Sequence, residues 1–153
     1  MKKNFTKIAA LFGFLIIGPQ AFAEEEAKAP DLGAIVGDYL NAWAAINQLD
    51  TDIDDYKYYN TFFTEDISYE IPEFDMVFQG EDFLSGEPSG SGRVRNSENT
   101  IDKMIIGKNV VFLKMNGKAD MRRSEEDDWQ TISRPDFLVI VFEGDKIKRI
   151  IDY

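Results

Sequence analysis

The chain has 153 residues with a formal net charge of −11, and it contains neither cysteine nor histidine. These absences exclude disulfides, thiolate and imidazole metal sites, and the Ser-His-Asp and Cys-His nucleophile systems. An acidic surface repels phosphate backbones, so we expect no nucleic-acid partner. Any acid–base chemistry must use Asp, Glu, Tyr or Lys.

The first 23 residues have the pattern of a secretory signal peptide. Lysines precede an apolar stretch over residues 8–17, and small residues stand at Ala21 and Ala23. We expect cleavage after Ala23, a polar spacer over residues 24–30, and one domain over residues 31–153. The alternative is a membrane anchor, but the apolar run is about half the length of a membrane span. The expected location is therefore periplasmic or secreted, with no membrane contact after cleavage.

Two helices are expected first. Asp31 is a suitable N-cap, and the apolar residues after it follow a helical stripe that fades near Asn47. After an acidic connection over residues 49–55, aromatic residues predict a second helix from Tyr56 to Phe63, ended by residues 64–66. Asp50 to Asp54 resembles the start of an EF-hand loop, but glycine is missing at its sixth position and glutamate at its twelfth. Helix capping explains these aspartates better, so no metal site is expected.

The rest of the chain predicts strands. Residues 67–71 alternate as a strand that Pro72 ends, and residues 73–78 are interpreted as a loop at a pocket mouth. A Gly- and Ser-rich segment over residues 84–92 is typical of a loop. Further strands are expected over residues 100–106, 109–121, 131–142 and 146–153, with a charged hairpin tip at 123–128. Asn116-Gly117 is a strong hairpin signal that would split the second of these strands. The order of elements predicts an α+β domain.

This order resembles the nuclear transport factor 2-like superfamily, which includes ketosteroid isomerases, SnoaL-type polyketide cyclases and limonene epoxide hydrolases. The resemblance rests on residues 39–43, 62–72, 80–82 and 142–147. It implies a cone-shaped curved antiparallel sheet, with two to three N-terminal helices closing an apolar cavity. It also implies a small apolar ligand, no cofactor, and a homodimer through an outer sheet face that carries Ile147, Ile151 and Tyr153.

The steroid isomerase activity is not expected. The base of that family precedes the proline that ends its first strand, and here Ile71 occupies that position. Glu70 would point to the opposite face unless a bulge turned it inward. Tyr39 is similar in place to the family's oxyanion tyrosine, although a core tyrosine on an apolar stripe is the plainer interpretation.

The resemblance to limonene epoxide hydrolases implies a catalytic set. Lys118-Ala119-Asp120 and the final Asp152 match that family's Arg-x-Asp and its last-strand aspartate, and Tyr69 matches its water-binding tyrosine. By this resemblance Asp152 would be the base, Asp120 the acid and Lys118 the cation between them. Lysine lacks the planar fork with which arginine binds two carboxylates. The alternative is a solvated strand face, with Met115, Ala119 and Met121 on the buried side.

Aromatic and aliphatic side chains that could line the cavity are Tyr39, Trp43, Tyr59, Phe62, Phe63, Ile71, Phe78 and Ile150. An ordinary core could use the same residues. Two functions therefore remain: an exported small-molecule-binding protein without chemistry, or an epoxide hydrolase-like or lyase enzyme using Asp152 and Asp120. In the enzyme both carboxylates must lie in one pocket near Tyr69, and in the binding protein they need not.

Overall fold

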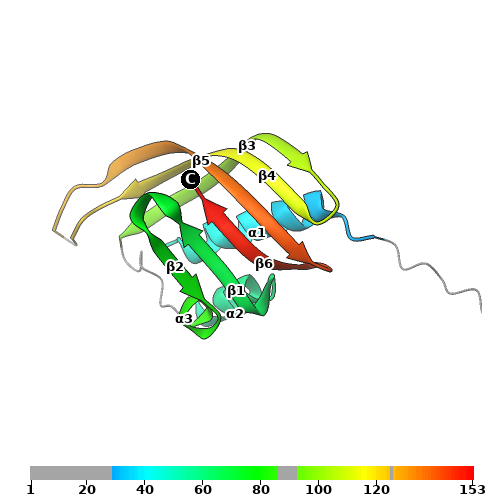
Figure 1. Cartoon of the computed structure of the whole chain (residues 1–153). Helices are drawn as coiled ribbons and strands as arrows, with labels where there is room; N and C mark the ends of the chain where they lie inside the picture. The colour runs from blue at the N-terminus through cyan, green and yellow to red at the C-terminus, as the bar shows by residue number, and fades with distance from the viewer. Residues whose placement is uncertain (1–28, 86–92, 125) are drawn as a thin grey trace, which may run out of the picture.

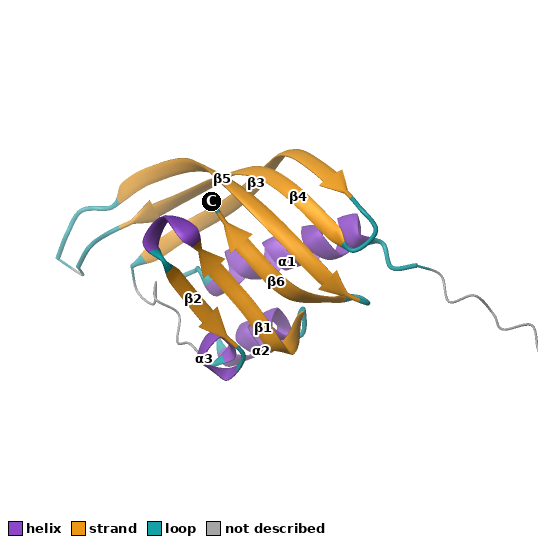
Figure 2. Cartoon of the chain, in the orientation of Figure 1, coloured by secondary structure: helices purple, strands orange, loops and turns teal. Residues whose placement is uncertain are grey.

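The computed structural model describes residues 29–85, 93–124 and 126–153. The expected signal peptide, most of the spacer and most of the Gly- and Ser-rich segment lie outside the described residues. Within them a curved six-stranded sheet, in the order β2-β1-β6-β5-β4-β3, carries helices on one face (Figures 1 and 2). The sheet does not close, because β2 and β3 remain its edges. No helix of the described part is long and apolar enough to cross a membrane.

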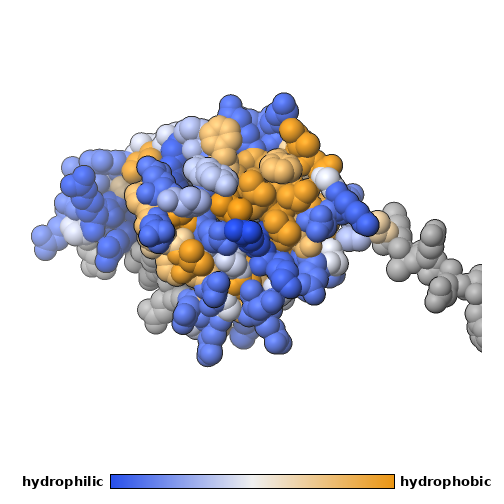
Figure 3. Space-filling model, viewed as in Figure 1, coloured by the Kyte–Doolittle hydropathy of each residue, from blue (hydrophilic) through white to orange (hydrophobic). Residues whose placement is uncertain are grey.

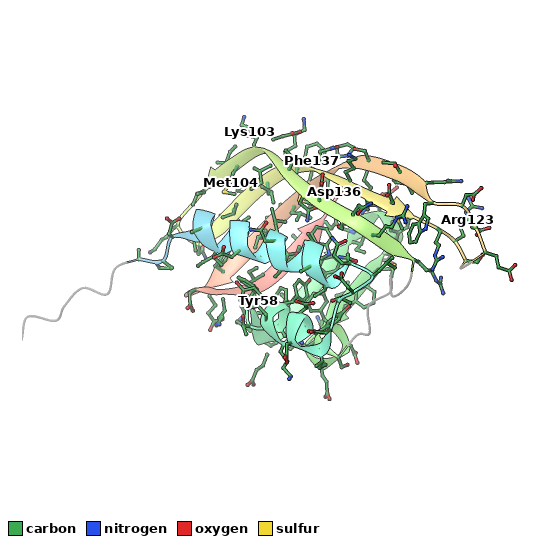
Figure 4. All side chains as sticks on the ribbon, turned by 180° about the vertical axis from the view of Figure 1, so that it is seen from behind. Tyr58, Lys103, Met104, Arg123, Asp136 and Phe137 are labelled. Atoms are coloured by element: carbon green, nitrogen blue, oxygen red, sulfur yellow. The ribbon has the colours of Figure 1, made fainter. Side chains whose placement is uncertain are left out.

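Helix α1 (Leu32–Ile46) begins where the Asp31 carboxylate accepts a hydrogen bond from the Ala34 amide, at 3.1 Å. This confirms the expected N-cap. Helix α2 (Ile53–Asn60) begins at Asp52, which forms a capping box with Asp55. The aspartates that resemble an EF-hand loop therefore cap a helix here. Seen from behind, α1 crosses the concave face of the sheet (Figure 4).

Helix α2 ends three residues earlier than the aromatic pattern predicts. Strand β1 (Phe63–Ile71) follows almost at once, so the predicted helix end at residues 64–66 is wrong. The segment predicted as a mouth loop forms a 3-10 turn (Pro72–Phe74) and the short strand β2 (Met76–Gln79), followed by α3 (Glu81–Leu84). Pairing of β2 with β1 overrides the local turn signals, since it satisfies backbone groups that a loop would leave to water.

Four long strands complete the sheet: β3 (Val94–Ile106), β4 (Val110–Met121), β5 (Gln130–Glu143) and β6 (Lys146–Asp152). Strand β4 runs straight through Asn116-Gly117, so the hairpin alternative is wrong. All neighbours are antiparallel except β1 and β6, which are parallel. This parallel pair brings Tyr69 opposite Ile150, close to the end of β6.

The core lies between α1, α2 and the concave face of the sheet. Tyr39, at 1% exposure, stands at its centre and contacts the rings of Trp43, Tyr59, Phe62 and Phe63. Strands β4 and β5 contribute buried residues at every second position, as the pleat requires: Val111, Leu113 and Met115 on β4, and Leu138 and Ile140 on β5. Ile67 of β1 and Ile147 and Ile150 of β6 join them in the core. Ile147 is thus a core residue, which corrects its expected place on the outer face.

Candidate functional site

A pocket of about 800 Å³ lies between the helices and the concave face of the sheet. Most of its wall is aromatic or aliphatic. The apolar lining comes from Trp43, Tyr59, Tyr69, Ile71, Met76, Phe78, Phe83, Val94, Ala119, Met121 and Ile132. The polar lining comes from Asn47, Ser97, Asn99, Lys118, Arg134 and Asp136, with Gly117 between them. A concave, mainly apolar wall with a few polar groups is the usual form of a small-molecule site.

Tyr69 joins this pocket to a buried carboxylate. Its hydroxyl donates a hydrogen bond of 2.7 Å to Oδ2 of Asp152, which is 8% exposed. Burial, and then the charge of Asp152, raise the pKa of Tyr69 well above its ordinary value. Tyr69 therefore remains a protonated donor across the physiological range, and it holds the Asp152 carboxylate in one orientation.

A second buried carboxylate, Asp136, lies beside the first. Strand β5 carries it two residues before Leu138, which pairs directly with Asp152, so both carboxylates share the concave face. Asp136 is 6% exposed, and Nε of Arg134 lies 3.0 Å from its Oδ1. Burial raises the pKa of Asp136, Arg134 opposes this rise, and the charge of Asp152 adds to it.

Gly117 makes room for this carboxylate. It lies opposite Arg134 in the β4–β5 register, and a Cβ built on it would stand 3.3 Å from Oδ2 of Asp136. Any side chain at this position would press on Asp136 and fill part of the pocket. Gly117, which the sequence pattern places in a possible hairpin turn, thus lies inside a strand. Its lack of a side chain lets the Asp136 carboxylate approach closely.

The two carboxylates have different surroundings, which suits different proton-transfer roles. Asp152 accepts the hydrogen bond of Tyr69, whereas the pKa of Asp136 is raised by burial. Paired carboxylates whose environments separate their protonation states are the usual basis of acid–base catalysis by Asp and Glu. The same groups can also bind the hydrogen-bond donors of a ligand without reacting.

The structure brings together Tyr69 and Asp152, but it does not bring Asp120 or Lys118 to them. Asp120 pairs with Thr131 and Asp152 with Leu138, so about 23 Å of strand β5 separates the two aspartates. Asp120 instead accepts hydrogen bonds from Thr131 and Asn96, at 2.7 and 2.8 Å. Lys118 is exposed at the pocket edge. The predicted Asp-Lys-Asp arrangement is therefore not assembled, because strand register places its members too far apart.

Sequence reasoning missed Arg134 and Asp136, although a signal was present. Arg134-Pro135-Asp136 contains an Arg-x-Asp, one strand later than the Lys-x-Asp chosen from the sequence. Buried residues alternate along the strand after it, at Leu138, Ile140 and Phe142, and this alternation places Asp136 on the buried face.

The predicted lining residues divide into two groups. Trp43, Tyr59, Ile71 and Phe78 line the pocket. Tyr39, Phe62, Phe63 and Ile150 pack in or against the core and are absent from the pocket wall.

Glu70 lies on the far side of β1 from Tyr69. Both oxygens of its carboxylate accept hydrogen bonds from Arg149, each at 2.7 Å, and Ser68 donates a third at 2.9 Å. No bulge turns Glu70 into the pocket, and Ile71 stands in the wall where a steroid isomerase would carry its base. This geometry agrees with the prediction that the chain lacks the catalytic base of a steroid isomerase.

Comparisons with solved structures identify the fold. A structure assigned as a SnoaL-like polyketide cyclase from Shewanella putrefaciens is 13% identical, has a TM-score of 0.66, and is matched over 82% of this chain and 90% of that chain. A protein with a ketosteroid isomerase-like fold from Catenulispora acidiphila, in complex with trimethylamine, is 17% identical with a TM-score of 0.61, over 82% and 85%. The chain therefore has the nuclear transport factor 2-like fold. No family model and no curated protein matches the sequence.

We expect Asp136→Asn to raise the melting temperature near neutral pH. Burial raises the pKa of Asp136, so its ionised form costs folding free energy above that pKa, and asparagine removes the cost. The gain should disappear below about pH 3.9, where the unfolded carboxyl is protonated too. Thermal melts of both proteins across this range provide the measurement. A gain that does not change with pH would contradict the argument.

Proposed function

We propose that this protein is exported and binds a small, mainly apolar molecule in the pocket between α1, α2 and the sheet. The observation that carries the proposal is the mainly apolar wall that ends at the buried carboxylate of Asp136. Tyr69 stands in this wall and is hydrogen-bonded to a second buried carboxylate, Asp152, which is not itself a lining residue. The apolar wall would provide affinity by burial, and the polar groups would orient the ligand.

Filling the pocket tests this proposal. Gly117→Leu places a side chain in the pocket wall, whereas the matched change Gly37→Leu on helix α1 meets open space. We expect Gly117→Leu to weaken binding of the neutral fluorescent probe Nile red at least about tenfold, since the probe loses buried area. Gly37→Leu should bind like the unmodified protein. Ala119→Leu serves as a second pocket variant if Gly117→Leu fails to fold. Equal binding by all of these proteins contradicts a pocket site.

A second candidate function is epoxide hydrolysis, favoured by the arrangement of Asp152, Asp136 and Arg134. Asp152 would take a proton from water while the water oxygen attacks an epoxide carbon. The carbon–oxygen bond opens as Asp136 gives its proton to the epoxide oxygen, and a diol forms. Arg134, beside Asp136, takes the place that the sequence assigned to Lys118. Tyr69 would keep Asp152 oriented toward the water.

Turnover of a small apolar epoxide separates this enzyme from a simple binding protein. If the enzyme proposal holds, Asp152→Asn and Asp136→Asn should each lower kcat by about 10²–10⁴-fold, the usual contribution of a general base or acid. Asp120→Asn is the matched control, because Asp120 lies outside the pocket, and it should keep the original rate. Equal rates in all variants would contradict the enzyme proposal, and ligand binding would be the remaining proposed function.

We further propose a homodimer through the outer face of the sheet. Ile105, Phe112, Val139 and Ile151 are direct cross-strand neighbours, so they form one apolar row over β3, β4, β5 and β6. Phe112 is 49% exposed and Ile105 is 54% exposed. Figure 3 shows apolar surface gathered over this part of the sheet. A contiguous exposed apolar patch of this kind favours association.

Sedimentation of two variants tests the dimer. Phe112→Glu adds a charge inside the apolar row and should convert the dimer to a monomer, because an unpaired charge is costly in an apolar interface. Ser133→Glu adds the same charge to an exposed strand position outside the row and should leave the dimer intact. An unmodified protein that sediments as a monomer at high concentration contradicts the proposal.

The mass of the mature protein, together with its location in the cell, tests export. Production of the full chain in a bacterial host should yield a periplasmic or secreted protein that begins at Glu24. A product that keeps its first residues in the membrane fraction would instead support the anchor.

A further inference from the structure

A second hollow, of about 990 Å³, adjoins the pocket at the end of the sheet where β4 and β5 meet in a hairpin. Both hollows share Asn47, Val94, Met121 and Ile132 as lining residues, so they adjoin each other along this wall. The shared wall is mostly apolar, and Met121 and Ile132 are 40% and 43% exposed there. A ligand in the inner pocket can therefore extend outward without leaving apolar contact.

The outer hollow is rich in arginine, although the chain is acidic. Every arginine of the sequence except Arg149 lies on β3, β5 or the segments next to β3 and β4, and the net charge of the whole chain is −11. Two of them, Arg95 and Arg122, lie over the Trp129 ring, with guanidinium carbons 4.2 and 4.6 Å from its centre. This stacking stiffens the hairpin base, because each cation attracts the ring face.

Arg93 and Arg123 differ from the other arginines in their ion pairing. Both line the outer hollow, and within the described ranges neither forms an ion pair, whereas Arg95, Arg134 and Arg149 each have a carboxylate partner. Figure 4 places Arg123 on the hairpin at this end of the sheet. Two aspartates, Asp127 and Asp128, line the same hollow, and Oδ2 of Asp127 accepts a hydrogen bond from the Ser124 amide at 2.9 Å. The guanidinium groups of Arg93 and Arg123 are thus available to an anion. A guanidinium group can bind a carboxylate through two parallel hydrogen bonds.

The two adjoining hollows together have a definite length. Asp136 at the inner end and Gln130 at the outer end lie six positions apart on β5, which corresponds to about 20 Å. Both ends carry charges of both signs: Asp136, Arg134 and Lys118 line the inner pocket, and three arginines and two aspartates line the outer hollow. The one arginine of the inner pocket, Arg134, is already paired with Asp136, so the guanidinium groups open to an anionic head lie at the outer end.

We propose that the ligand of this pocket is an amphiphilic acid, whose apolar body fills the inner pocket and whose carboxylate binds Arg93 and Arg123 at the outer end. This proposal rests on the proposed binding function and adds the chemical class of the ligand. The proposal specifies the head group of the ligand and leaves its apolar body open, because an apolar wall accepts many chain shapes.

Three probes with the same chain and different heads provide the test: decanoate, decanol and decyltrimethylammonium, each below its micelle-forming concentration. Calorimetric titration should show decanoate binding about tenfold more tightly than either other probe, and its affinity should fall as salt is added. Decanol or the cation binding as tightly as decanoate overturns the anionic subsite and leaves the pocket function standing. No binding by any probe overturns both.

Charge removal locates the subsite. The double variant Arg93→Gln with Arg123→Gln should weaken decanoate binding about tenfold, a typical loss for charge-assisted hydrogen bonds, and leave decanol binding unchanged. Lys103→Gln with Lys108→Gln removes the same charge at exposed positions near the far end of β3 and should change neither. If the two double variants weaken decanoate binding equally, the effect is one of net charge and the subsite is overturned.

Discussion

Ile140→Ala should lower the free energy of unfolding by about 2–5 kcal/mol, the range for truncating a fully buried large aliphatic side chain. Ile140 has no exposed surface, and it sits at the centre of the sheet, paired with Val111 on one side and Ile150 on the other. The loss combines the transfer free energy of the removed groups with the cavity left among neighbours that cannot close it. A domain of this size has a total stability of about 5–15 kcal/mol, so the variant should be close to unfolding.

Urea denaturation measures this change, and Val77→Ala is its control. Val77 is 57% exposed on the edge strand β2, so its truncation should change stability by no more than about 0.5 kcal/mol. A loss at Ile140 as small as the loss at Val77 would mean that the sheet centre is loosely packed. The pocket could not then be held in a fixed shape.

Tyr69→Phe should cost about 1–3 kcal/mol, because it leaves the Asp152 carboxylate buried without its hydrogen-bond donor. The ring and its packing against Phe83, with centroids 5.4 Å apart, are retained, so the loss reports on the hydroxyl alone. The same variant should also weaken any ligand that depends on the orientation of Asp152.

A double-mutant cycle isolates this interaction. Combining Tyr69→Phe with Asp152→Asn should cost less than the sum of the two single changes, since both remove the same hydrogen bond. Tyr58→Phe serves as the matched control: Tyr58 is 54% exposed, and its change should be close to neutral. Strict additivity of Tyr69 and Asp152 would contradict a functional link between them.

Periodicity predicted much of the fold. The N-cap at Asp31, the helix after it and the long strands of the second half all follow local patterns that tertiary contacts reinforce. The errors occur where a local signal competes with strand pairing. Phe63 continues an aromatic helical stripe but begins β1, and Asn116-Gly117 looks like a turn but lies inside β4. In both cases pairing with a distant strand satisfies more backbone groups than the local alternative.

The candidate site was predicted only in part. The family resemblance predicts Tyr69 and Asp152, and the structure places them in direct contact. It predicts Asp120 as the second carboxylate, whereas Asp136 lies beside Asp152. Both aspartates stand two positions after a cation, so the motif could not distinguish them. The difference depends on register between strands that are adjacent in the sheet, and register is a long-range property.

The sequence by itself determined the acidic charge, the lack of thiol and imidazole chemistry, the α+β class, and which strand positions alternate between two faces. These are properties of composition or of neighbours along the chain. Tertiary structure alone decided that β1 runs parallel to β6, that Gly117 leaves room for Asp136, and that arginines from distant segments gather at one end of the pocket. Their physical cause is the pairing and curvature of the sheet, which bring together side chains that no local spacing relates.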